Sequence, residues 1–148
     1  MIDIKEIRSH IKNGTEESRF TAWLTLYSSD EPEVNEEIKG ILNGTDPILK
    51  ILLARFLSHL NTEKAIHDLI NLLEDENYVV HQAACKAFER NFFEQKNQKL
   101  FPLIYSRYGY VKEYAIETLA FSGYSLLVAP LLTFEKNAPN NFKIKILS

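Results

Sequence analysis

The chain has 148 residues, of which 45% are hydrophobic and 25% are charged, and this composition is ordinary for a globular domain. Its formal net charge of −3 argues against a general attraction to nucleic acid or to an anionic membrane. A single cysteine, Cys85, excludes an intramolecular disulfide and fits a reducing compartment.

No apolar run approaches the roughly 18 residues that cross a bilayer. The opening residues are charged and amphipathic, unlike a signal peptide. We therefore expect a cytoplasmic protein that has no contact with a membrane and forms one domain over residues 1–148.

The first predicted helices follow from apolar spacing and from turn residues. Ile4, Ile7 and Ile11 form one stripe of an amphipathic helix, which we expect to end at Asn13-Gly14 in a left-handed backbone conformation. A second helix is predicted over about residues 16–27, and Pro32 suits the first turn of a third helix.

Further along, Asp46-Pro47, Thr62 and Asn77 are strong signals for helix starts. The pattern of predicted helices is interrupted over residues 91–97. Pro102 is expected near the start or at a kink of the next helix, and Gly123 at the end of a helix over residues 110–121. Residues 137–141 are predicted to form a loop, and residues 142–148 a short closing helix.

A nine-residue pattern recurs with a period of 31 residues. Its second residue is basic or His, its fifth is Ala or Leu, and its ninth is large and apolar. The copies cover residues 18–26, 49–57, 80–88 and 111–119, with a partial copy at 142–146. The period predicts an array of about five helical hairpins, over about residues 1–29, 30–60, 61–93, 94–122 and 123–148.

The third repeat carries a resemblance to a known family. It resembles the HEAT-like repeat named after phycobilisome lyases, although His67 stands where that family usually has Pro and His81 where it usually has Arg. The resemblance covers essentially the whole chain and implies an all-α fold, a right-handed α-α superhelix that forms a short solenoid. It says little about function, because the family includes scaffolds, enzyme subunits and inhibitors. The matching residues are Ala65, Ile66, Leu69, Leu72, Leu73 and Asp75, then Val80, His81, Ala83, Ala84, Ala87 and Phe88.

Positions within the pattern separate an expected core from an expected partner site. The fifth and ninth positions should be buried between helices. The resemblance implies that the second helices line a concave surface, and the third and seventh positions would then face its groove. The alternative is a solvated face with an end cap. The predicted partner-binding residues are Phe20, Leu24, Ile51, Arg55, Gln82, Lys86, Glu113 and Glu117.

We predict no catalytic, cofactor-binding or metal-binding residue and expect no cofactor. The four histidines make no metal-ligand pair and are interpreted as surface or turn residues. Cys85 is expected to be a buried, unreactive thiol, and Trp23 to be part of the core. Five tyrosines in and near the fourth repeat could form a second contact surface. These are Tyr105, Tyr108, Tyr110, Tyr114 and Tyr124.

Three functions remain open from the sequence. The first is a non-catalytic protein-binding scaffold, adaptor or inhibitor, such as a bacterial immunity protein or a small regulatory subunit, whose partner is another protein. The second is nucleic-acid binding, as in alkylpurine DNA glycosylases of similar fold. That function needs a basic groove, against which Glu113 and Glu117 argue. The third is a subunit of a chromophore lyase or chaperone, which only the family name suggests.

Overall fold

The computed structural model describes residues 3–137 of the chain, and every regular element in that range is helical: nine α-helices and two 3₁₀ helices. The chain divides into two compact units, Met1–Lys96 and Asn97–Ser148. We call them the N-terminal and the C-terminal unit. The division falls close to the predicted boundary between the third and fourth repeats.

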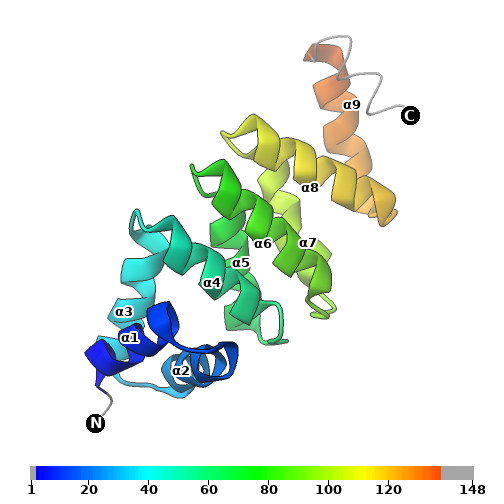
Figure 1. The fold of residues 1–148 in the computed structure, drawn as a ribbon. Coiled ribbons are helices and arrows are strands. Elements are labelled where there is room, and N and C mark those ends of the chain that lie inside the picture. The colour runs from blue at the N-terminus through cyan, green and yellow to red at the C-terminus, as the bar shows by residue number, and fades with distance from the viewer. Residues whose placement is uncertain (1–2, 138–148) are drawn as a thin grey trace. The chain divides into compact units, whose positions relative to one another are not determined.

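The N-terminal unit contains six helices connected by short turns. Within it, α1 packs against α2, α5 packs against α6, and α4 lies against both α5 and α6 (Figure 1). The helices are α1 (Ile4–Asn13), α2 (Glu16–Ser28), α3 (Pro32–Asn43), α4 (Pro47–Leu57), α5 (Glu63–Leu73) and α6 (Tyr78–Arg90).

Side-chain caps fix where these helices begin. The Asp46 carboxylate accepts hydrogen bonds from the N–H groups of the first turn of α4, and Pro47 occupies the first helical position. The Thr62 hydroxyl and the Asn77 side chain accept from the first turns of α5 and α6. Each cap satisfies N–H groups that have no partner inside the helix. All three predicted helix starts are confirmed, as is the position of Pro32 at the start of α3.

The end of α1 differs from the prediction. Gly14 has φ −83° and ψ 176°, so the backbone there is extended and the prediction of a left-handed conformation at Asn13-Gly14 is wrong. Glycine is needed for space instead. A Cβ atom on Gly14 would lie 2.5 Å from the carbonyl oxygen of His10, and one on Gly44 2.7 Å from that of Gly40. The chain leaves both helices by passing close to the preceding turn.

The C-terminal unit has shorter and less regular elements. α7 (Lys96–Leu100) begins at the last residue of the N-terminal unit and continues as a 3₁₀ helix, Phe101–Tyr105, where Pro102 supplies no N–H for an α-helical bond. Next come α8 (Gly109–Phe121), a 3₁₀ turn (Ser125–Leu127) and α9 (Val128–Asn137). The predicted loop over residues 137–141 is wrong at Asn137, which is the last residue of α9. Residues 138–141 of that loop and the predicted closing helix lie outside the described residues.

Gly123 ends α8 as predicted. Its φ of 68° is the left-handed conformation that glycine adopts without steric cost. The N–H of Tyr124 donates to the carbonyl of Leu119, and the N–H of Gly123 donates to that of Ala120. These two bonds form a Schellman motif, which satisfies carbonyl groups at the end of the helix.

The predicted core positions are buried. All eight residues at the fifth and ninth positions of the pattern expose at most 6% of their surface, and Trp23 exposes 1%. A fully buried Leu or Phe side chain typically stabilises the fold by about 1.5–3 kcal/mol. These residues are Ala22, Leu26, Leu53, Leu57, Ala84, Phe88, Ala115 and Leu119.

The basic second position has a structural use in the N-terminal unit. Arg19 Nε donates to the carbonyl of Ile11 (2.8 Å), and His81 Nδ1 donates to that of Leu73 (2.8 Å). Each acceptor lies eight residues back, at the end of the preceding helix, and the two bonds stand two 31-residue periods apart. In the second repeat Lys50 instead forms a buried salt bridge with Asp75. The interpretation of all four histidines as surface or turn residues is therefore wrong for His81, which lies within α6 and is 4% exposed.

Candidate partner-binding grooves

Two neighbouring grooves lie on the N-terminal unit. The α2–α4 groove has a volume of about 640 Å³ and lies between residues of α2 and α4. The α4–α6 groove has a volume of about 660 Å³ and is formed mainly by α4 and α6. Glu16, Arg55 and His59 line both grooves, so the two concavities adjoin along α4.

Six of the eight predicted partner-binding residues line these grooves. Phe20 and Leu24 line the α2–α4 groove, Ile51, Gln82 and Lys86 line the α4–α6 groove, and Arg55 lines both. The other two predicted residues, Glu113 and Glu117, lie on α8 of the C-terminal unit and line neither groove.

The α2–α4 groove has an aromatic floor and an exposed apolar rim. The Phe56 ring, only 3% exposed, lies 5.4 Å from the Phe20 ring centroid and 6.1 Å from that of Trp23. Phe20 and Leu24 stand one helical turn apart on α2 and expose 41% and 42% of their surface. Adjacent exposed apolar side chains beside a concavity are typical of a contact surface.

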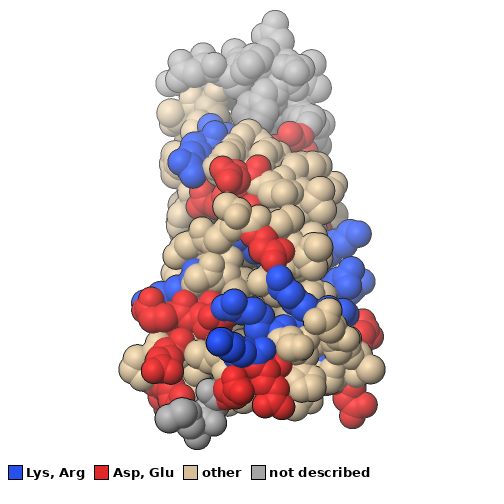
Figure 2. All heavy atoms as spheres, turned by 60° about the vertical axis from the view of Figure 1, so that its left-hand side comes forward, with Lys and Arg blue, Asp and Glu red and all other residues tan. Residues whose placement is uncertain are grey.

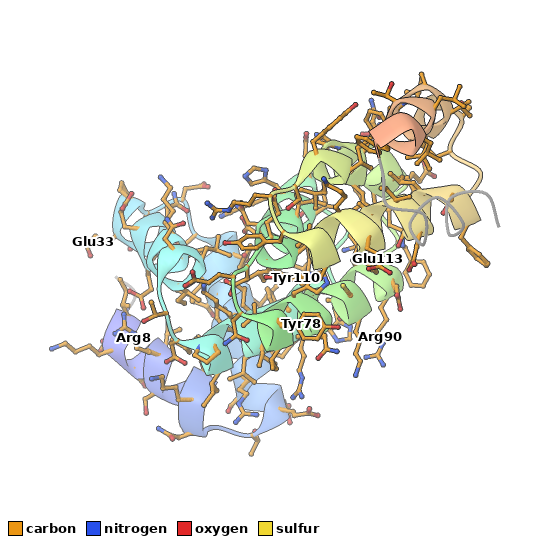
Figure 3. The ribbon with its side chains drawn as sticks, turned by 90° about the horizontal axis from the view of Figure 1, so that it is seen from above. Arg8, Glu33, Tyr78, Arg90, Tyr110 and Glu113 are labelled. Atoms are coloured by element: carbon orange, nitrogen blue, oxygen red, sulfur yellow. The ribbon has the colours of Figure 1, made fainter. Side chains whose placement is uncertain are left out.

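The α4–α6 groove is basic although its unit is acidic. Residues 1–96 contain 11 Lys and Arg against 17 Asp and Glu, a formal net charge of −6. The residues that line the groove include three basic side chains, Arg55, Lys86 and Arg90, and one carboxylate, Glu16. Figure 3 shows Arg90 at the last residue of α6, and Tyr78 marks the first residue of the same helix.

Most other cations of the N-terminal unit already have a partner, whereas these three do not. Among the Lys and Arg side chains of residues 3–96, four form no salt bridge, no hydrogen bond and no contact with an aromatic ring: Lys5, Arg55, Lys86 and Arg90. Three of these four therefore meet in one groove. The partnered cations are Arg8 with Glu37, Lys12 with Asp46, Lys39 with Glu36, Lys50 with Asp75, Arg19 and Lys96 with backbone carbonyls, and Lys64 with the Tyr27 ring.

Sequence reasoning missed Glu16, His59 and Arg90. Arg90 follows Lys86 by four residues and lies one turn further along the same face of α6, whereas His59 follows Arg55 by four residues and lies in the turn just after α4 ends at Leu57. Extending the third and seventh positions of the pattern by four more residues would have found both. Glu16 comes from the first turn of α2, and no position of the pattern indicates it.

Cys85 and His81 form a contact that the sequence analysis also missed. The Cys85 Sγ lies 3.4 Å from His81 Nε2. Since Nδ1 of the neutral ring donates to the Leu73 carbonyl, Nε2 is left to accept from the thiol. Burial raises the pKa of Cys85 to about 12 and lowers the pKa of His81. The pair is therefore a neutral thiol beside a neutral imidazole, whereas nucleophilic cysteines react as thiolates.

Within the described part of the chain, no cluster of three or more His, Cys, Asp or Glu side chains could hold a metal ion. No helix there has the length and apolar character needed to cross a membrane. Comparisons with known proteins found no matching family model, no matching curated protein and no matching solved structure.

Proposed function

We propose that the chain is a non-catalytic protein-binding scaffold, adaptor or inhibitor, and that the two grooves of the N-terminal unit hold its partner protein. One observation carries the proposal: exposed apolar side chains adjoin three cations that have no partner in the described part of the unit. Apolar anchors beside charged groups are typical of the surfaces through which proteins recognise one another.

We also propose that the helices form a short HEAT-like solenoid, a right-handed superhelix. The 31-residue period, the burial of the fifth and ninth positions and the matching bonds of Arg19 and His81 support it. In such an array each hairpin covers the apolar stripe of its neighbour, and the second helices provide the binding surface.

Nucleic-acid binding is the less favoured candidate. The α4–α6 groove offers three cations, whereas proteins that bind duplex DNA tightly contact about 6–10 phosphates. The acidic character of the N-terminal unit opposes the approach of a polyanion. On the face drawn in Figure 2, Lys and Arg side chains lie among Asp and Glu side chains over that unit. The third function, a chromophore lyase subunit, has no reactive thiol in the grooves, because Cys85 lines neither.

The test is affinity capture from a lysate of the source organism with the full-length tagged chain, read by mass spectrometry. We expect the wild type to retain a specific protein that the Arg55→Glu/Lys86→Glu variant loses. Both side chains are exposed, so reversal of their charge should leave the fold intact.

The matched control is Lys5→Glu/Lys39→Glu. It changes the net charge by the same amount at two exposed lysines that line neither groove. Retention of the partner by this control and its loss from the groove variant would locate binding at the grooves. Equal retention by all three proteins would contradict the site, and recovery of nucleic acid alone would replace the proposal with its alternative.

A further inference from the structure

We propose that the partner presents an acidic, amphipathic peptide segment, with apolar side chains in the α2–α4 groove and carboxylates in the α4–α6 groove. This inference rests on the proposed function, since it specifies the chemistry of the segment that the same two grooves would bind.

The apolar half of the segment follows from the shape and composition of the α2–α4 groove. Phe20 and Leu24 lose solvent contact only if something covers them, and Phe56 beneath them gives an aromatic floor. Covering such apolar surface removes it from water and so stabilises the complex. A Leu, Met or aromatic side chain of the partner has the matching chemistry.

The acidic half follows from the uncompensated cations. Arg55, Lys86 and Arg90 line one groove, and none lies within 4.0 Å of a carboxylate in the described part of the chain. Partner carboxylates would form charge-assisted hydrogen bonds with them, and the guanidinium groups allow two parallel bonds. Because the rest of the unit is acidic, an acidic segment placed elsewhere on it meets repulsion. Charge therefore selects the groove as well as the ligand.

The two halves must belong to one short segment. Arg55 and His59 line both grooves, so the apolar and the basic surfaces adjoin at these two residues and lie within reach of one short segment. A partner whose carboxylates lie far from its apolar side chains could occupy only one groove. Glu16, which also lines both grooves, places a negative charge at this junction, so the segment would have an uncharged residue there. A chain of evenly spaced phosphates has no such uncharged position.

The test is selection from a phage-displayed library of random short peptides on the immobilised full-length chain, with Arg55→Glu/Lys86→Glu as the counter-selection. We expect the enriched peptides to carry several Asp or Glu together with Leu, Met or aromatic residues. By fluorescence anisotropy, the most enriched peptide should bind the charge-reversed variant about tenfold more weakly. Its affinity should fall by a smaller factor for Phe20→Ser/Leu24→Ser, and should not change for Lys5→Glu/Lys39→Glu.

Three outcomes overturn the inference. The first is that no peptide is enriched, and the second is that the enriched peptides are neutral or basic. The third is that duplex DNA or single-stranded RNA, added at the same total negative charge as the peptide, displaces the peptide from the chain. Its failure can be told apart from failure of the proposed function. If the lysate partner is lost with Arg55→Glu/Lys86→Glu but the enriched acidic peptide does not displace it, the grooves bind protein through other chemistry. If no groove-dependent partner exists, the proposed function itself fails.

Discussion

The helices α4 and α6 use basic residues in opposite ways on their two faces. On the face toward the other helices, Lys50 and His81 are 6% and 4% exposed, and each has a polar partner in the preceding or following part of the chain. On the groove face, Arg55 and Lys86 are exposed and have no partner among the described residues. In each helix the buried base and the exposed base are five residues apart: Lys50 and Arg55 in α4, and His81 and Lys86 in α6.

This difference shows that residue type alone does not separate structural from functional cations. A buried charge has lost its hydration, and it is tolerated only where a carboxylate or carbonyl replaces the water. An exposed charge keeps its hydration and remains available to a partner. The environment of each base therefore predicts whether its loss should affect folding or binding.

The largest expected effect comes from breaking the buried pair. Lys50→Ala leaves the Asp75 carboxylate, which is 9% exposed, without its cation. We expect the free energy of unfolding to fall by about 3–5 kcal/mol, because an uncompensated charge remains buried. Urea denaturation followed by circular dichroism measures this loss.

The control is Lys50→Met/Asp75→Asn, which removes both charges. The Asp75 carboxylate now accepts a hydrogen bond from the N–H of Asn77 (2.9 Å), and the amide oxygen of the substituted side chain can accept the same bond. This variant should recover most of the lost stability. If the double variant is as unstable as Lys50→Ala, the uncompensated buried charge does not explain the effect.

A second, smaller effect concerns the pH dependence contributed by His81. Burial lowers the pKa of His81 in the folded chain, so the unfolded chain binds the proton more readily. The stability contributed by neutral His81 is full above the ordinary histidine pKa and is lost as the pH falls from about 7 towards 5.

The comparison variant is His81→Gln, whose amide can donate to the Leu73 carbonyl but does not titrate. Urea denaturation of both proteins at pH 7 and pH 5 gives the difference between them. We expect the wild type to lose stability relative to the variant at the lower pH. A difference that is independent of pH would mean that His81 is not kept neutral by its surroundings.

The smallest expected effect is on the groove face. Arg55→Glu/Lys86→Glu should change the free energy of unfolding by no more than about 0.5 kcal/mol, because neither side chain is buried or paired within the described residues. Thermal and urea denaturation check this. If the free energy of unfolding fell by nearly as much as in Lys50→Ala, the groove-face cations would also be needed for folding. Loss of partner binding by the variant could then reflect unfolding.

Much of the fold could be predicted because the relevant signals are local. Caps such as Asp46 and Asn77 act within one turn, and the 31-residue pattern places Ala84 and Phe88 in the core without any knowledge of the partner helices. The conformation at Gly14 could not be predicted in this way. Asparagine next to glycine commonly indicates a left-handed turn. Here the His10 carbonyl lies so close to Gly14 that it leaves no room for a Cβ atom, and this contact requires glycine.

The site was predicted in part for the same reason. Helical spacing placed the third and seventh positions on one face of each second helix, and the resemblance implied that these faces line a groove. The grooves contain four such residues, Phe20, Leu24, Arg55 and Lys86. It could not show which cations were already paired. The pattern separates Lys50, at its second position, from Arg55, at its seventh, but it could not show that Asp75, 25 residues after Lys50, is the partner of that lysine.

Lys96 gives the N-terminal unit a defined last residue. Its ammonium group donates to the carbonyls of Phe88 (3.0 Å) and Asn91 (3.1 Å), so a side chain from beyond α6 closes the end of that helix. A chain shortened to residue 96 would keep these two bonds, whereas one shortened to residue 95 would lose both. One lysine thus decides where the protein could be divided for expression of its N-terminal part.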